Sequence, residues 1–135
     1  MHLSFSTELP DPEAYYRLYQ STGWDREGIW TPERLHLALQ GSWHIVTACR
    51  DGRLAASGRL VSDGVLQCFV CDMIVLPEYQ GQGIGGGILQ RLLDYSRSHG
   101  IRWVQLACAQ GRRGFYEKYG FKERAADAPG MNLFL

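Results

Sequence analysis

The stretch Gln80-Gly81-Gln82-Gly83-Ile84-Gly85-Gly86 decides the fold. It follows an apolar run that ends at Val75-Leu76-Pro77, and it precedes a helical pattern that continues to about His99. A junction of strand, glycine loop and helix presents backbone N–H groups and the positive end of a helix dipole. Such a junction binds phosphate, so the sequence predicts a site for a phosphate-bearing small molecule.

Composition and length favour an ordinary globular chain with one domain, residues 1–135. The formal net charge is zero, so the sequence lacks the excess positive charge typical of nucleic-acid-binding proteins. No apolar run approaches the ~20 residues that span a bilayer. The start, Met1-His2-Leu3-Ser4, lacks the basic flank and apolar core of a secretory signal. We therefore expect a cytoplasmic protein with no nucleic-acid or membrane partner.

Periodicity and turn signals predict a mixed α/β sheet with the element order βααβββαβαββ. Asp-Gly turns at 50–53 and 63–64 join antiparallel neighbours. Strand 65–76 is apolar on both faces, so we expect it to be central. The predicted strands are 3–6, 43–49, 54–61, 65–76, 101–108 and a pair after 121 that ends with 131–135; the predicted helices are 12–21, 31–39, 83–98 and 111–119.

Cys68 and Cys71 form a C-x-x-C pair, which raises a redox or zinc protein as one class. The pair lies inside a predicted strand, where positions three apart point to opposite faces. A zinc site also needs further ligands nearby, and the histidines show no ligand spacing. The sequence therefore predicts free thiols and no metal site.

Three phosphate-binding motifs compete for the glycine stretch. A P-loop needs Gly-Lys-Ser/Thr, and no lysine follows these glycines. Gly81, Gly83 and Gly86 match G-x-G-x-x-G, but the next strand, 101–108, has no carboxylate for a ribose. The third match is Gln-x-x-Gly-x-Gly, from Gln80, Gly83 and Gly85.

With this third motif in residues 75–85, and with Phe115-Tyr116-Glu117-Lys118-Tyr119-Gly120-Phe121 downstream, the chain resembles the GNAT superfamily of N-acetyltransferases. One helix and one strand separate the two blocks, as in the family. The resemblance covers nearly the whole chain and is greatest to small single-domain members, with a weaker likeness to plastid-type arylalkylamine acetyltransferases. It implies a GNAT-like, mostly antiparallel central sheet with flanking helices.

The resemblance implies acetyl-CoA as co-substrate. Backbone N–H groups of the glycine loop would cradle its pyrophosphate, and the end of strand 65–76 would bond the pantetheine arm like an added strand. The residues expected to bind the cofactor are Ile74, Val75, Gln80, Gly81, Gln82, Gly83, Ile84, Gly85 and Gly86.

Tyr116 matches the family tyrosine that acts as general acid toward the leaving thiolate; packing beside its aromatic neighbours is the alternative. A backbone N–H near Ile74 or Val75 would meet the oxyanion. The position where many members carry a glutamate base is here Phe69.

Asp72 is the carboxylate that the apolar run 65–76 does hold. A carboxylate in such a run is costly unless it is paired or functional. Two interpretations stay open: Asp72 is the base or an amine-binding group, or it forms a structural ion pair, for which Arg59 on the neighbouring strand is a candidate.

The acceptor is predicted from residues 1–35, which hold six acids against three arginines together with several aromatic residues. In the family this segment covers the acceptor cleft, and an acidic, aromatic lining suits a small primary amine. The apolar final strand is consistent with a homodimer. The alternative function is a non-catalytic acyl-CoA-binding sensor or regulatory subunit, which the missing glutamate favours.

Overall fold

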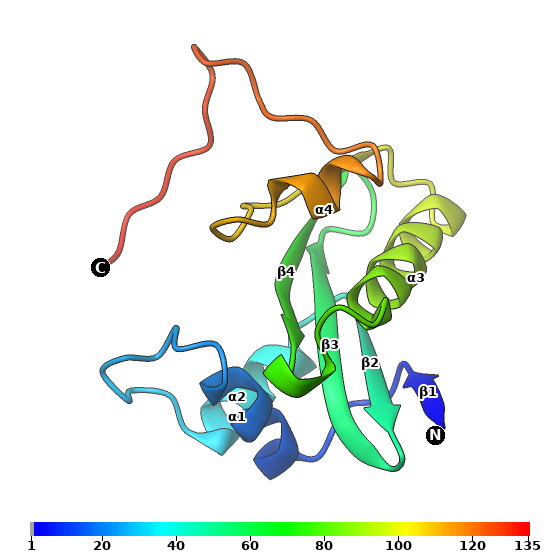
Figure 1. Ribbon diagram of the computed structural model, residues 1–135. Helices are drawn as coiled ribbons and strands as arrows, with labels where there is room; N and C mark the ends of the chain where they lie inside the picture. Colours follow the sequence, from blue (N-terminus) through cyan, green and yellow to red (C-terminus); the bar gives the residue numbers. More distant parts are fainter. Residues whose placement is uncertain (1) are drawn as a thin grey trace. The chain divides into compact units, whose positions relative to one another are not determined.

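The computed structural model describes residues 2–135 (Figure 1). The chain divides into two compact units, Met1–Gln105 and Leu106–Leu135, and each is described by itself. The first unit is built on a five-stranded sheet with the order β1-β2-β3-β4-β5. Neighbouring strands are antiparallel, except that β4 and β5 run parallel. The strands are β1 (Leu3–Ser6), β2 (His44–Arg50), β3 (Arg53–Ser62), β4 (Gln67–Val75) and β5 (Trp103–Gln105).

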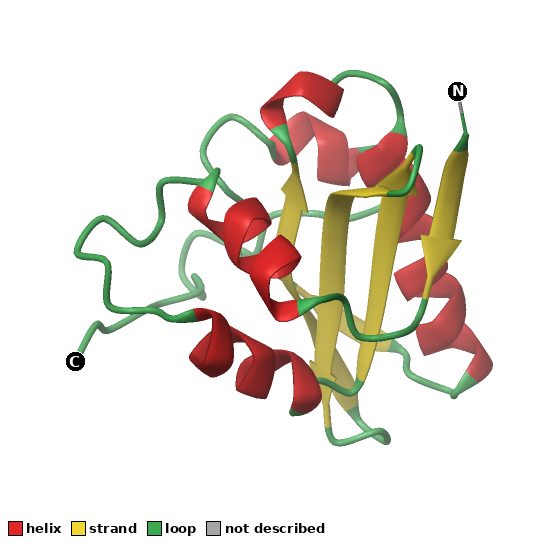
Figure 2. Ribbon diagram, turned by 90° about the horizontal axis from the view of Figure 1, so that it is seen from below, coloured by secondary structure: helices red, strands yellow, loops and turns green. Residues whose placement is uncertain are grey.

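Helices cover both faces of this sheet (Figure 2). On one face lie α1 (Pro12–Gln20) and α2 (Pro32–Gln40), each with proline in its first turn. The Asp11 carboxylate accepts a hydrogen bond from the Ala14 N–H at 3.0 Å, and the Thr31 hydroxyl caps α2 in the same way. One buried cluster joins these helices to the sheet: Tyr15, Leu18, Leu35, Leu39, Ile45, Ile74 and Leu76.

The other face carries α3 (Ile84–Ser98), whose apolar stripe is fully buried. The close approach of this helix to β3 requires glycine at position 58. A Cβ there would meet the Met73 Sδ at 2.5 Å and the Ile88 Cγ2 at 2.8 Å. Gly100, with a φ of +77°, follows the end of α3, where a residue in the left-handed conformation commonly ends a helix.

The fold class predicted from the sequence, a mostly antiparallel mixed sheet with flanking helices, is confirmed. The turn between β2 and β3 has positive φ at Asp51 and Gly52, which accounts for its Asp-Gly sequence. β4 is an interior strand, but it begins at Gln67 rather than at residue 65. The Asp63 carboxylate accepts hydrogen bonds from the N–H groups of the next two apolar residues and holds them in a turn.

The second unit differs from its prediction. It contains α4 (Arg113–Glu117), shorter than predicted but at the expected place. The predicted strand pair after 121 is wrong: residues 121–135 hold no strand. The stretch 125–130, Ala-Ala-Asp-Ala-Pro-Gly, has weak β-propensity and a proline, and the apolar end 131–135 is exposed. The observed order of strands and α-helices is therefore βααβββαβα.

Candidate functional site: the glycine loop and the edge of β4

The glycine loop connects a short 3₁₀ turn, η1 (Pro77–Tyr79), to α3. Gly81 and Gly83 have φ of +77° and +81°, in the left-handed region that other residues adopt rarely. Gly83 is the N-cap of α3. The backbone conformation thus accounts for glycine at both positions, and a Cβ on either would meet none of the described atoms within 4 Å.

The first turn of α3 leaves its N–H groups exposed to a ligand. Among the described residues no side chain caps this helix, in contrast to α1 and α2. The first intrahelical bond runs from the Gly87 N–H to the Gly83 carbonyl at 3.1 Å. The N–H groups before it, from Gly83 to Gly86, have no partner within the helix. This is the geometry that an anion satisfies.

Three side-chain contacts tie the loop region to the sheet. The Gln80 amide donates to the Val75 carbonyl at 3.0 Å, which holds the start of the loop against the end of β4. The Arg50 guanidinium donates to the Gln82 amide oxygen at 2.6 Å. Arg53, on the same β2–β3 turn, lies 3.6 Å from the Glu78 carboxylate. Sequence reasoning missed the two arginines, since neither lies near the loop in the chain.

Next to this loop, the end of β4 has a backbone edge that no strand within residues 2–105 covers. β5 pairs only with Gln67–Phe69, so within residues 2–105 no strand covers the same edge of β4 beyond residue 69. The Leu76 N–H donates to Ala55 of β3, and alternation therefore directs the N–H of Val75 away from β3. Ile74 pairs with Ser57 and directs its groups toward β3. Of the two predicted oxyanion donors, the geometry favours Val75, whose role stays a prediction.

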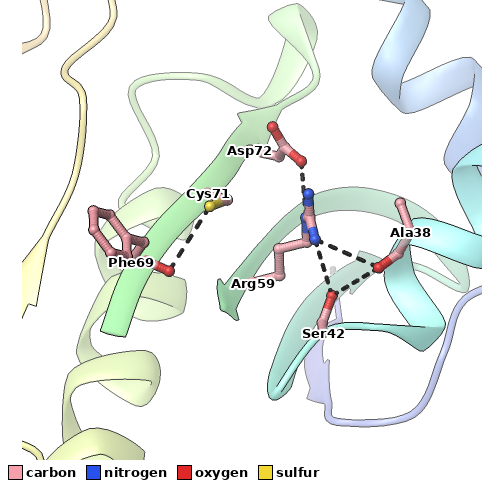
Figure 3. Close-up of polar contacts among 6 residues, drawn as sticks. All are labelled: Ala38, Ser42, Arg59, Phe69, Cys71 and Asp72. Carbon is pink, nitrogen blue, oxygen red and sulfur yellow. Dashed lines mark hydrogen bonds and ion pairs between the residues drawn. The ribbon is translucent and has the colours of Figure 1, made fainter. Parts of the chain in front are cut away.

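Asp72 lies in a β-bulge, with a left-handed φ of 52°. Its carboxylate pairs with the Arg59 Nε at 2.8 Å, and the two side chains are only 27% and 18% exposed. Arg59 Nη1 also donates to the Ala38 carbonyl at 3.4 Å and to the Ser42 hydroxyl at 3.3 Å (Figure 3). The ion pair named as one alternative for Asp72 is thus formed, and it links β3 and β4 to the end of α2.

Two phenols of α1 lie within the field of Asp72. Burial raises the pKa of Tyr15, and the Asp72 charge raises it further. The pKa of Tyr19 is raised by the same two causes in the same order. Tyr19 also contacts Trp24 edge-on, with ring centroids 5.7 Å apart. A carboxylate, the buried phenol of Tyr15 and the partly buried phenol of Tyr19 with the exposed Trp24 therefore gather on the α1 face of the sheet.

The loop between α1 and α2 presents apolar side chains to solvent: Trp24 is 47% exposed, Ile29 62% and Trp30 39%. Asp25 shapes this loop by accepting hydrogen bonds from the N–H groups of Ile29 and Trp30. Desolvation is the largest single effect on the pKa of Asp25 and raises it, but the hydrogen bonds from Gln20 and from the loop backbone together outweigh it and lower the pKa. The loop is thus an ordered element with an apolar outer surface.

The cysteine pair has the arrangement that the strand predicts. Cys68 is buried and its thiol lies 3.4 Å from the Ser96 hydroxyl of α3, whereas Cys71 pairs across the strands with Arg59 on the other face. Burial raises the pKa of both thiols. All four cysteines are free. Within residues 2–135 no group of three or more His, Cys, Asp or Glu side chains is arranged to hold a metal ion.

Tyr116 belongs to the second unit, where it is 9% exposed and packs edge-on against Phe115 and Phe121. Burial raises the pKa of its phenol, and the neighbouring Cys108 adds to this. Packing, the alternative for this residue, is observed. Because the glycine loop belongs to the other unit, the role of Tyr116 as general acid stays a prediction.

Comparison with known proteins gives a consistent result. A family model described as the acetyltransferase (GNAT) family matches residues 9–121. Serotonin N-acetyltransferase 2, chloroplastic, from Oryza sativa subsp. japonica is 36% identical over 106 residues, which are 76% of this chain and 53% of the rice protein. Glucosamine 6-phosphate N-acetyltransferase 1 from the same plant is 33% identical, over 65% of this chain and 59% of its own length. The chain thus spans less than two thirds of these relatives.

Among solved structures, a probable acetyltransferase of unknown function from meticillin-resistant Staphylococcus aureus superposes with a TM-score of 0.87 at 25% identity. The match covers 99% of this chain and 100% of the staphylococcal one. In the part of the chain that the structure describes, no helix is both long and apolar enough to cross a membrane.

Proposed function

We propose that this chain, which belongs to the acetyltransferase (GNAT) family, moves an acetyl group from acetyl-CoA to a primary amine. One observation carries the proposal. The glycine-built start of α3, which no described side chain caps, lies beside the edge of β4 that no strand of residues 2–105 covers, and Gln80 joins the two. A ligand that combines a pyrophosphate with an amide-containing arm suits that pair of features, since N–H groups bind phosphate and a free strand edge binds amides.

In the proposed complex, the N–H groups of residues 82–86 hold the pyrophosphate of acetyl-CoA. The pantetheine arm extends along β4 beyond Phe69, where its amides replace the missing strand. The thioester lies against this same edge of β4. We place the carbonyl oxygen at the Val75 N–H, which is directed to that side of the strand.

The proposed reaction is a direct transfer. The lone pair of a neutral amine attacks the thioester carbon, and the N–C bond forms as the charge on the carbonyl oxygen is met by the Val75 N–H. The tetrahedral intermediate collapses, the C–S bond breaks, and the thiolate takes a proton from the Tyr116 phenol. The amine loses its proton to water, and the phenolate is reprotonated from solvent.

A small amine is the proposed acceptor. The support is the α1 face of the sheet, where Asp72, Tyr19 and Trp24 could receive a cation with an apolar body. Two relatives are named for acetylation of small amines, glucosamine 6-phosphate and serotonin. Cytoplasmic localisation and a homodimer remain parts of the proposal; several relatives are named as chloroplastic.

The test is thiol release from acetyl-CoA in the presence of single amines, among them arylalkylamines, polyamines, amino acids and amino sugars. We expect turnover with at least one of these small amines. Turnover with lysine-containing peptides alone would overturn the small-amine proposal. An absence of turnover with every amine would overturn the proposal that the chain is a transferase.

A non-catalytic acyl-CoA-binding role is the second candidate, because the position expected to hold a base is the half-exposed Phe69. Tyr116→Phe separates the two. A transferase that uses the phenol should lose roughly 10²-fold or more in kcat while CoA affinity is kept. A binder shows CoA affinity and no rate in either protein.

A further inference from the structure

Arg50 is the last residue of β2, and it contacts the glycine loop although the two are far apart in the chain. Its Nη2 donates to the Gln82 Oε1 at 2.6 Å. Gln82 lies between Gly81 and Gly83, the two loop glycines with positive φ. A contact to its side chain therefore restrains this part of the loop backbone. The side chain of Gln82 is otherwise exposed, and a fixed position for it therefore depends on this contact.

The position of Arg50 is unfavourable in two respects. Its Nε is buried and has no hydrogen-bond partner among the described residues. It also lies directly across the β2–β3 ladder from Arg53, a like charge. Unsatisfied buried donors and opposed like charges both cost stability. Packing thus does not account for an arginine here, whereas a role at the adjacent loop does.

We infer that Arg50 is a positioning residue that holds the glycine loop in its phosphate-binding conformation through Gln82. The inference rests on the proposed acetyl-CoA site. A loop fixed before binding loses less conformational entropy when the ligand arrives, and affinity rises accordingly. The effect belongs to the binding of the donor, because Arg50 contacts the loop proposed to hold the pyrophosphate and not Val75 or Tyr116, the residues proposed to act in the transfer.

The test is a double-mutant cycle on CoA affinity, measured by isothermal titration with Arg50→Met, Gln82→Ala and the double variant. We expect each single change to raise the Kd of CoA about tenfold, the loss of one charge-assisted hydrogen bond. Because both act through one contact, the double variant should bind no more weakly than the weaker single variant. For Arg50→Met the KM for acetyl-CoA should rise, with kcat and the KM for the amine unchanged.

Arg53→Met is the matched control. It removes the same charge from the same turn, but its pair with Glu78 is longer and more than half exposed. Exposed pairs of this kind contribute little, so its Kd for CoA should equal that of the wild type. Melting curves of all variants verify folding, and Gln82→Ala, which alters an exposed side chain, tests the inference even if Arg50→Met does not fold.

The outcomes are distinguishable. If the wild type does not bind CoA, the proposed function fails. If the wild type binds CoA and Gln82→Ala binds it equally well, the inference is overturned. It is also overturned if the effects of the two changes add, since Arg50 would then act on the ligand independently of Gln82.

Discussion

Replacement of Asp72 by Asn tests whether the ion pair with Arg59 holds the two layers of the first unit together. Asn keeps the shape of the side chain and tolerates the left-handed backbone at this position, so the change removes the charge and little else. Arg59 keeps its bonds to Ala38 and Ser42 but loses the anion that balances it at 2.8 Å. We expect a less stable protein.

The size of the loss follows from the burial of the pair. Breaking a fully buried pair costs about 3–5 kcal/mol, and a hydrogen bond to a charged group contributes about 1.5–3 kcal/mol. With Asp72 27% and Arg59 18% exposed, water offsets part of this cost. We therefore expect about 2 kcal/mol, which corresponds to a fall in Tm of about 7 °C for a chain of this length.

Urea and thermal unfolding at neutral pH measure the change, with Arg59→Met and the double variant completing a cycle. If the pair acts as a unit, the double variant should be more stable than the sum of the single losses implies. A Tm shift below about 2 °C for Asp72→Asn would refute the reasoning. A loss of amine turnover without a loss of stability would instead indicate that Asp72 acts as the base or binds the amine acceptor.

Two further predictions concern stability. Gly58→Ala should cost about 1–3 kcal/mol, because its Cβ would meet the Met73 Sδ at 2.5 Å, whereas Gly130→Ala, with open space around it, should be neutral in the same melts. Burial lowers the pKa of His44, whose ring stacks on Tyr95 at 3.5 Å. The folded state thus favours the neutral ring, so the contribution of His44 is complete above about pH 6.5 and falls as the pH drops below that value. In His44→Phe the fall between about pH 6.5 and pH 5.5 should be smaller; equal slopes in urea titrations would contradict this.

Local signals in the sequence predicted most of the fold. Asp11 and Thr31 act as helix caps, and Asp51-Gly52 forms the tight turn, because each depends on residues next to it in the chain. The prediction of a strand pair after residue 121 is wrong because strand formation does not depend on neighbouring residues alone. A strand requires a partner edge, and apolar residues such as Phe134 carry no information on whether one is present.

The candidate site, too, could be predicted from the sequence only where it depends on short motifs or neighbouring strands. The glycine loop and Gln80 follow from a short motif, and Arg59 was a candidate partner of Asp72 because the predicted hairpin placed their strands side by side. Arg50 could not be found in this way. It reaches Gln82 from 32 positions earlier, and no periodicity links the two.

The bulge at Asp72 shifts the alternation of β4 side chains between the two faces of the sheet by one residue. In the first half of the strand an even-numbered residue, Cys68, faces α3; in the second half an odd-numbered one, Met73, does so, and Ile74 turns to the opposite layer. Deletion of a single residue here would make the alternation regular along the whole strand. Every side chain after the deletion would then lie on the opposite face of the sheet. Alignment or redesign of this strand must therefore be counted from the bulge outward, separately in each direction.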